Sequence, residues 1–338
     1  MNPEAAKRLG KTYRELNGTQ VQELNGPPTA LEFSRLVHIN RPVIFRNCFD
    51  SHDLPALCKW DDAYLCRKMA DRTMTVAVTP DGLADAVKVS DDGQPYFTEP
   101  YAEKMTMNQL FDVLRKTPTE YGSAIPTRDV YYLQSQNGNL GGSGCIDNET
   151  YELKPLSGDV TPDVPWATEA LDRRPDAVNL WIGDSRSITS VHSDPYENIY
   201  TVIRGEKHFT LLPPTEGYCL DERLYKHARY TRSHRGAPLS ISPSSNVDGT
   251  NQMISWASID PTSSSVPVDT HPMRATLRPG DALYLPAGWW HHVRQSGEVV
   301  IAVNWWYDME MRGMSWVWLS YLRNHLEDRI SLDVETQS

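Results

Sequence analysis

The sequence has no long hydrophobic run and no excess of positive charge. The most apolar segment of note, Val299 to Val303, ends at Asn304, far short of the roughly 18 residues that a membrane-spanning helix needs. There are 33 Lys and Arg residues against 44 Asp and Glu residues, so the formal net charge is −11. A field of this sign repels nucleic acids and anionic membranes. We therefore expect no membrane segment and no direct nucleic-acid partner, whereas a basic partner suits the charge.

Cysteine is scarce, and no secretory signal is visible. The five cysteines are widely scattered, and no two have the C-x-x-C spacing of a zinc or redox site; they are Cys48, Cys58, Cys66, Cys145 and Cys219. Residues 1–18 carry charges and asparagine where a signal peptide has an apolar segment. These absences predict mostly buried free thiols and an intracellular protein, located in the cytoplasm with the nucleus left open.

Residues 1–130 mix helix and strand signals, and we interpret them as an α/β region that packs on a larger core. Thr29-Ala-Leu-Glu32 has the pattern of a helix capping box, and Pro42 is expected to end the helix that follows. Val43 to Phe45 predicts a short buried strand. Further elements are expected at 60–69 (helix), 74–78 (strand), 106–109 (start of a helix) and 130–133 (strand).

Residues 131–310 contain the strongest strand signals, and we expect an all-β core there. From Asn179 onward, short apolar runs are separated by Gly and Pro, which is typical of a β sandwich or barrel. Arg204-Gly-Glu206 is predicted to be a hairpin turn, and three later strands are expected; the strand segments are 199–203, 207–212, 282–285, 291–294 and 299–305. Residues 233–269, rich in Ser, Pro, Asn and Gly, are interpreted as a surface insertion with limited order.

The C-terminal segment, residues 311–338, is expected to be helical. Its apolar side chains lie around most of the helix, because Trp318 and Leu322 are four residues apart while Trp316 and Leu319 lie on another side. Such a helix is either packed fully onto its own core or shared with a second subunit. We expect a homodimer, with packing within the chain as the alternative.

A candidate metal site begins at His192-Ser-Asp194, where an imidazole and a carboxylate on one strand project to the same face. Such a short pattern often arises by chance, so a third ligand is needed. The segment Trp289-Trp-His-His292 offers that ligand at the start of a later strand. Two histidines and one carboxylate on a β scaffold form the facial triad of non-haem Fe(II) oxygenases, which leaves about three of six coordination positions open. Iron is therefore the expected metal.

Lys207 distinguishes an oxygenase from a plain metal-binding barrel. It lies 15 residues after His192, on the partner strand of the predicted hairpin. A cation buried inside a β-barrel is costly unless it is paired, and the distal carboxylate of 2-oxoglutarate is a natural partner. The alternative is a solvated lysine beside Glu206.

Six segments together resemble the jumonji-C (JmjC) family of oxygenases. They are His192-Ser-Asp-Pro-Tyr-Glu-Asn198, Gly205-Glu-Lys-His-Phe209, Pro213-Pro214, Pro279-Gly-Asp-Ala-Leu-Tyr-Leu-Pro286, Trp290-His-His-Val293 and Asn304-Trp-Trp-Tyr307. Within the family, further segments resemble its small lysyl hydroxylases, namely 78–87, 164–167, 175–179 and 304–310. The resemblance spans most of the chain but does not place the insertion at 233–269.

The resemblance implies an α+β fold: a double-stranded β-helix of the cupin or jelly-roll type, with flanking N-terminal helices and strands and a C-terminal helix. It implies that three residues bind iron, namely His192, Asp194 and His291, and that Lys207 holds 2-oxoglutarate. The family's ligand directly follows the aromatic residue of a Trp-His pair, which selects His291 over His292. Other positions resemble cosubstrate-binding residues, namely Thr189, Tyr132 and Asn198, and Asn304 resembles an amide near the iron.

In activity, the resemblance implies hydroxylation of a protein lysine at C3 with Fe(II), 2-oxoglutarate and O2, and developmentally regulated GTP-binding proteins as substrates. An N-methyl-lysine demethylase is the alternative within the same chemistry. A peptidase acting on methylated histone tails is another alternative, but no H-E-x-x-H sequence supports it. A non-catalytic cupin-like module is disfavoured, because all four anchor residues are present.

Overall fold

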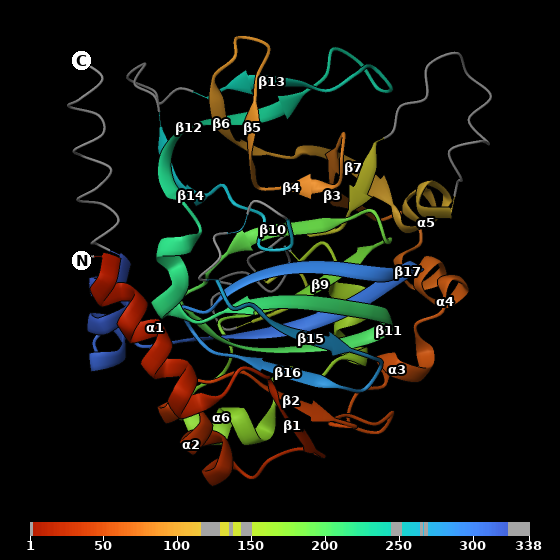
Figure 1. Cartoon of the computed structure of the whole chain (residues 1–338). Helices are drawn as coiled ribbons and strands as arrows, with labels where there is room; N and C mark the ends of the chain where they lie inside the picture. Colours follow the sequence, from red (N-terminus) through yellow and green to blue (C-terminus); the bar gives the residue numbers. More distant parts are fainter. Residues whose placement is uncertain are drawn as a thin grey trace.

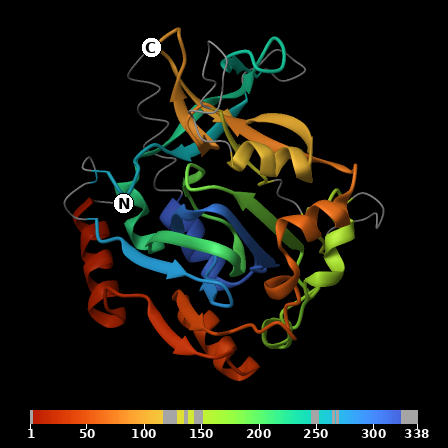
Figure 2. The same cartoon turned by 90° about the vertical axis from the view of Figure 1, so that its right-hand side faces the viewer.

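The computed structural model describes residues 3–115, 129–134, 138–142, 151–244, 252–263, 266 and 270–323. A nine-stranded sheet occupies the centre of the molecule, and a five-stranded sheet lies above it in the view of Figure 1. Helices cover the outside of the curled central sheet (Figure 2). This arrangement confirms the predicted α+β class with a β core and flanking helices.

The described elements comprise helices of two kinds and strands in three sheets. The α-helices are α1 (Pro3–Asn17), α2 (Ala30–Ile39), α3 (Ala56–Lys59), α4 (Asp62–Met69), α5 (Met107–Arg115) and α6 (Pro165–Leu171), and the 3-10 helices are η1 (Lys154–Asp159) and η2 (Pro214–Cys219). The nine-stranded sheet contains β1 (Gln22–Asn25), β2 (Val43–Arg46), β4 (Leu83–Ala84), β9 (Ala177–Gly183), β10 (Ile188–His192), β11 (Tyr196–Leu212), β15 (Met273–Leu277), β16 (Ala282–Leu285) and β17 (Trp290–Asp308). The five-stranded sheet contains β5 (Ala86–Val89), β6 (Pro95–Glu99), β12 (Glu222–Thr231), β13 (Ser240–Pro243) and β14 (Met253–Ala257), and the three-stranded sheet contains β3 (Thr73–Thr79), β7 (Tyr101–Thr106) and β8 (Val130–Tyr132).

The N-terminal elements form where the local sequence predicts them. Thr29 caps α2 through a complete capping box, in which its hydroxyl accepts from the Glu32 backbone N–H and the Glu32 carboxylate accepts from the Thr29 backbone N–H. α2 ends at Ile39, and Asn40 follows in the left-handed conformation, so the helix stops before Pro42. β2, α4, β3, α5 and β8 occupy the other positions where elements were expected.

The N-terminal region packs directly on the β core. β2 pairs with β16 in antiparallel register, which places Phe45 opposite Ala282, and β1 pairs with β2 in parallel. From α2, the buried Phe33 ring contacts Trp166 at 4.8 Å and Tyr284 at 4.9 Å between ring centroids. Aromatic side chains of this size contribute strongly to stability, so the N-terminal region and the β core share one hydrophobic interior.

The strand breaks predicted at Arg204-Gly-Glu206 and near Gly297 are wrong. β11 runs without interruption through the first of these positions, and β17 runs through the second. The two strands pair with each other in antiparallel register, and register shifts lie between Val202 and Glu206. Gly205 has a φ of +75° and Gly297 a φ of +143°, so both glycines mark β-bulges in continuous strands.

The bulges let each long strand pair with one neighbour along its first half and with another along its second half. The first half of β11 pairs with β16, and its second half pairs with β15. The first half of β17 pairs with β10, and its second half pairs with β9. Two antiparallel strands that both change partner half-way form the double-stranded β-helix. As a result, His192 and Lys207 do not share a hairpin, because β17 lies between β10 and β11.

Two described segments of the insertion at 233–269 form strands. β13 and β14 both pair with β12 in antiparallel register. β12 in turn pairs with β6, a strand from the N-terminal region. The insertion therefore completes the five-stranded sheet, and it carries more order than its Ser- and Pro-rich composition predicts.

Residues 314–323 are helical and lie within the predicted C-terminal helical segment. One side of this helix faces its own chain: Leu319 packs so closely on Gly288 that a β-carbon there would clash, and the Arg323 guanidinium lies 5.5 Å from the Trp290 ring centroid. The other side exposes four apolar residues, Met314, Val317, Trp318 and Tyr321. The remainder of the segment, residues 324–338, lies outside the described residues.

In the described part of the chain, the structure shows how exposed the cysteines are and whether a helix could cross a membrane. The thiols of Cys48 and Cys219 are buried, Cys66 is half-buried and Cys58 is exposed, while Cys145 lies outside the described residues. Among the described helices, none combines the length and the apolar character that crossing a membrane requires.

Candidate metal centre

β10 and β17 bring the three predicted metal ligands together. The strands are antiparallel neighbours, and His192 lies directly opposite His291. Asp194 follows just past the end of β10. One ligand atom of each side chain lies within 4.8 Å of the ligand atoms of the other two. Two residues close together in sequence thus meet a distant histidine because their strands pair.

Backbone carbonyl groups hold both imidazoles in one tautomer. Nδ1 of His192 donates to the Ser190 carbonyl oxygen at 2.9 Å, and Nδ1 of His291 donates to the Trp289 carbonyl oxygen at 3.0 Å. Because a carbonyl oxygen only accepts, the proton lies on Nδ1 and Nε2 keeps its lone pair. The two Nε2 atoms lie 3.6 Å and 3.7 Å from Oδ2 of Asp194.

These distances fit three ligands around one ion. A hydrogen bond between nitrogen and oxygen spans about 2.7–3.2 Å, which is shorter than both separations. Two ligand atoms that each lie about 2.1 Å from a shared ion are roughly 3–4 Å apart. Two imidazoles and one carboxylate form the donor set of non-haem iron sites. The three residues can therefore hold a divalent metal ion such as Fe(II).

Mutual electrostatics keep Asp194 and His291 in the states that metal binding requires, whereas for His192 burial is outweighed by the attraction of Asp194, which raises the pKa. Burial disfavours the charge on Asp194, but the neighbouring His192 and His291 outweigh it and lower the pKa of the carboxyl group to about 2. Burial, together with His192, lowers the pKa of His291 to about 4. Near neutral pH, Asp194 is therefore ionised and His291 is neutral, and these are the forms that bind metal ions.

Lys207 is a buried cation for which the described residues provide no carboxylate partner. Its side chain is fully enclosed, and Nζ donates to the Tyr132 hydroxyl at 2.9 Å. Burial lowers the pKa of Lys207 to about 7. The Tyr132 hydroxyl is also hydrogen-bonded to Thr189, so three residues predicted to hold the cosubstrate form one group. An unpaired buried ammonium is unfavourable, so this group favours an anionic ligand.

The two asparagines of the prediction form a separate pair. Nδ2 of Asn304 donates to Oδ1 of Asn198 at 3.0 Å, and Nε1 of Trp181 donates to Oδ1 of Asn304 at 2.8 Å. The Trp181 ring lies 6.0 Å from the Tyr132 ring between centroids. Trp181 therefore connects the asparagines to the group around Lys207.

His292 points away from the three ligands, as the alternation of side chains along a strand predicts. Its Nε2 lies 3.8 Å from Oδ1 of Asp260, which belongs to the insertion. Burial lowers the pKa of His292 to about 4. Of the two neighbouring histidines, only His291 belongs to the group that could hold a metal ion.

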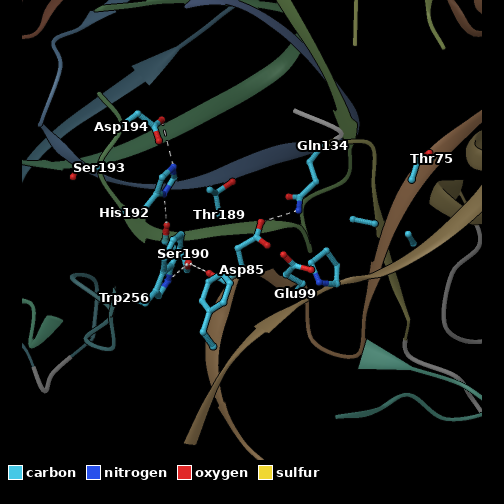
Figure 3. Close-up of a pocket in the computed structure, with 14 residues that line it drawn as sticks. Thr75, Asp85, Glu99, Gln134, Thr189, Ser190, His192, Ser193, Asp194 and Trp256 are labelled. Atoms are coloured by element: carbon cyan, nitrogen blue, oxygen red, sulfur yellow. Dashed lines mark hydrogen bonds and ion pairs between the residues drawn. The ribbon is translucent and has the colours of Figure 1, made fainter. Parts of the chain in front are cut away.

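A cavity of about 490 Å³ adjoins the metal ligands (Figure 3). His192 and Asp194 line it, and so does Thr189. Trp256 from β14 stacks on the His192 ring, with centroids 5.9 Å apart and planes 7° apart. Nε1 of Trp256 also donates to the Ser190 hydroxyl at 3.2 Å. The insertion therefore supplies one wall of the site.

Sequence reasoning did not identify several residues that line the cavity, among them Asp85, Phe97, Glu99, Gln134 and Trp256. Trp256 lies in a segment whose composition indicates little order, and the one signal it offers is the tryptophan itself, which has no other copy in residues 233–269. Asp85 lies between the short strands β4 and β5 with a φ of +52°. The family resemblance of its segment, 78–87, is the one sequence signal that points to it.

Comparison with known proteins is consistent with this geometry. The cupin-like domain family matches residues 28–313 of the chain. The chain is 37% identical over 296 residues to the human "Bifunctional peptidase and (3S)-lysyl hydroxylase JMJD7", covering 86% of this chain and 84% of the human protein.

Two further relatives match over similar lengths. The chain is 33% identical over 345 residues to "Lysine-specific demethylase JMJ32" of Arabidopsis thaliana, covering 97% of this chain and 93% of the relative. It is 32% identical over 323 residues to "JmjC domain-containing protein E" of Dictyostelium discoideum, covering 88% and 86%. The chain belongs to the cupin-like JmjC family of 2-oxoglutarate-dependent oxygenases.

Proposed function

We propose that this chain is an Fe(II)- and 2-oxoglutarate-dependent protein hydroxylase that acts on C3 of a lysine, with a developmentally regulated GTP-binding protein as the substrate. The observation that carries the proposal is Lys207, a buried ammonium on the strand next to that of His291. A barrel that only stores a metal ion does not need this cation, whereas a dicarboxylate cosubstrate needs a cation to bind its distal carboxylate.

The residues of the chain have distinct tasks in this proposal. The three metal ligands hold Fe(II), while Lys207 binds the distal carboxylate of 2-oxoglutarate together with the hydroxyl groups of Tyr132 and Thr189. When bound, Fe(II), 2-oxoglutarate and O2 supply the chemistry that inserts one oxygen atom into a C–H bond and releases succinate and CO2. The buried Trp181 and Tyr132 exclude water around Lys207, which strengthens its interaction with a carboxylate.

The relatives support a lysine substrate but favour two reactions. The human relative is named a (3S)-lysyl hydroxylase, and the Arabidopsis relative is named a lysine-specific demethylase. Demethylation of N-methyl-lysine is therefore the second candidate, and the match to the Arabidopsis protein over 97% of this chain favours it. The name of the human protein also includes a peptidase activity.

Mass spectrometry of peptides incubated with the purified protein, Fe(II), ascorbate and 2-oxoglutarate tests the proposal. We expect an unmodified lysine peptide from a GTP-binding protein to gain one oxygen atom, with release of succinate. A demethylase would instead remove a methyl group from an N-methyl-lysine peptide, and a peptidase would produce two fragments. The proposal is wrong if methylated peptides react while unmodified peptides gain no oxygen.

We further propose that the chain forms a homodimer through the helix at 314–323. The exposed apolar side chains recur at spacings of three and four residues and so form one stripe: Met314, Val317, Trp318 and Tyr321. A two-fold contact lets each helix cover the same stripe on its partner. Trp and Tyr are also the side chains that most often dominate interface energies. The opposite side of the helix already packs on its own chain.

A further inference from the structure

We propose that Asp85 binds the side-chain ammonium group of the substrate lysine inside the cavity next to the metal centre. The inference rests on the proposed lysyl hydroxylation, and it names the residue that recognises the amine. The cavity is already lined by two metal ligands, His192 and Asp194, so a side chain that enters it reaches the reacting centre.

Strand pairing places Asp85 beside the metal centre. Ala84 of β4 pairs with Thr189 of β10 in parallel register, so Asp85 follows next to Ser190. The Ser190 hydroxyl donates to the Asp85 carbonyl oxygen, which fixes the backbone of Asp85 to β10. The Asp85 carboxylate interacts electrostatically with both His192 and Glu99, and its side chain lies between theirs in Figure 3.

Within the described ranges of the chain, the Asp85 carboxylate forms no ion pair with a lysine or an arginine, and the imidazole that attracts it is that of the metal ligand His192. Its Oδ2 accepts a hydrogen bond from the neutral side-chain amide of Gln134 at 3.1 Å. The neighbouring Glu99 is different, because it lies 3.2 Å from Nε2 of His227 and 3.4 Å from Arg229. A half-buried carboxylate without a lysine or arginine partner gains most from an added cation. Asp85 therefore provides the recognition group, and Glu99 adds to the negative potential around it.

Two aromatic side chains that line the same cavity as Asp85 suit the apolar stem of a lysine. The Phe97 and Trp256 rings lie 4.6 Å apart between centroids, and both line the cavity. Trp256 is held in place by its contacts with His192 and Ser190. A lysine that passes these rings can bury its methylene groups while its ammonium group reaches a carboxylate.

The distance along β10 between the neighbour of Asp85 and the metal ligand His192 matches the distance in lysine between the amine and the carbon that is oxidised. Ser190 and the metal ligand His192 are two residues apart, which is roughly 7 Å along a strand. In an extended lysine side chain, C3 and the amine nitrogen are separated by about four bonds, or roughly 5 Å. An amine held at Asp85 therefore leaves C3 within reach of the metal centre. An N-methyl carbon is bonded to the nitrogen itself and would stay at Asp85.

Peptide binding to an Asp85→Asn variant tests the inference. Asparagine keeps the shape of aspartate and tolerates the left-handed φ of +52° at this position. The probes are a peptide around a lysine of a developmentally regulated GTP-binding protein and its twin with norleucine, which keeps the stem and lacks the amine. Binding is measured by fluorescence anisotropy with Mn(II) and N-oxalylglycine, so no turnover is needed. Asp91→Asn, at an exposed turn outside the cavity, is the matched control.

We expect the wild-type chain and Asp91→Asn to bind the lysine peptide at least tenfold more tightly than its norleucine twin. Asp85→Asn should bind the two peptides about equally. The inference is overturned if Asp85→Asn keeps the full preference for lysine, or if the wild-type chain binds neither peptide.

Asp85→Glu provides a second test that does not depend on removing the charge. Glutamate places the carboxylate one methylene farther from the backbone than aspartate does. A peptide with ornithine in place of lysine has a side chain that is shorter by one methylene. We expect the wild-type chain to prefer lysine over ornithine and Asp85→Glu to reverse that preference. An unchanged preference contradicts the inference. A peptide that binds through its amine but gains no oxygen with Fe(II) and 2-oxoglutarate contradicts the proposed hydroxylation and leaves the role of Asp85 standing.

Discussion

At the scale of single residues, the neighbouring histidines 291 and 292 offer a direct test of the metal centre. Nε2 of His291 lies toward Asp194, whereas Nε2 of His292 lies toward Asp260. We expect His291→Ala and Asp194→Ala to lose bound iron and succinate production, because each removes one of three ligands. His292→Ala should keep most of its iron. Metal content after reconstitution is the measurement, with circular dichroism to check folding, and equal iron loss in both histidine variants would contradict the assignment.

Lys207→Ala removes the cation that we expect to bind the distal carboxylate of 2-oxoglutarate. Loss of one partner from a desolvated charge pair costs about 3–5 kcal/mol, which is a factor of roughly 150 to 4,000 in the dissociation constant. Iron affinity should change far less, because the hydrogen bond of Lys207 goes to Tyr132. Separate titrations with 2-oxoglutarate and with Mn(II) measure the two effects. Equal damage to both would indicate misfolding instead of lost recognition.

The same lysine should make cosubstrate binding depend on pH. Burial lowers the pKa of Lys207 to about 7, and the protonated amine is the form that binds a carboxylate. Raising the pH above about 7 removes this proton from the free chain, so binding should weaken by up to about tenfold per pH unit. Lys207→Arg stays protonated throughout and should show a flat profile. A flat profile in the wild-type chain would exclude Lys207 as the titrating group.

The residues of the site were predictable where the signal is local. Asp194 follows His192 by two residues, just past the end of β10, and this spacing indicates a pair of ligands once a third ligand is found. Asp85 and Trp256 reach the cavity only because β4 pairs with β10 and β14 pairs with β12. A hydrophobic pattern identifies strands but does not tell which strands will be neighbours. Their place in the cavity therefore became visible only in three dimensions.

At the scale of elements, Gly205 allows β11 to bend without ending. Its φ is +75°, and a β-carbon there would lie 2.8 Å from Cγ2 of Val300. Gly205→Ala should therefore lower the free energy of unfolding by about 1–3 kcal/mol, through backbone strain and a steric clash together. Gly236→Ala is the matched control, because its φ is +83° with no atom within 4 Å, and it should cost about 1 kcal/mol. Urea unfolding measures both, and equal losses would exclude the clash.

The course of β11 and β17 also shows why the predicted hairpins failed. A glycine between two apolar runs looks the same in a hairpin turn and in a bulge within a continuous strand. The outcome depends on the partner: β11 continues because β17 remains paired with it on both sides of the bulge. Helices α2 and α5 were predictable because their capping residues form hydrogen bonds within the first turn. The sequence therefore predicts hydrogen bonds within a helix turn, but it does not predict which distant strands pair.

At the scale of the whole molecule, we expect negative charge on the exposed helix to dissociate the proposed homodimer. Trp318→Glu combined with Tyr321→Glu places two carboxylates on the exposed stripe of the helix at 314–323, and the chain should become a monomer by light scattering. Both residues are exposed on their own chain, so folding by circular dichroism should not change. Leu31→Glu, at an exposed position of α2, is the control and should remain dimeric. A monomeric wild-type chain would contradict the proposal.

The enclosed amine of Lys207 also bears on how long the protein persists. Without the anionic ligand that we propose for Lys207, the native state keeps a cationic side chain in its interior with no carboxylate partner among the described residues, which lowers its resistance to unfolding. A ligand that binds only the native state raises that resistance by mass action. Proteases act mainly on chains that have opened, so the rate of degradation follows the same balance. The abundance of this protein in a cell should therefore rise and fall with the supply of 2-oxoglutarate, an intermediate of carbon metabolism.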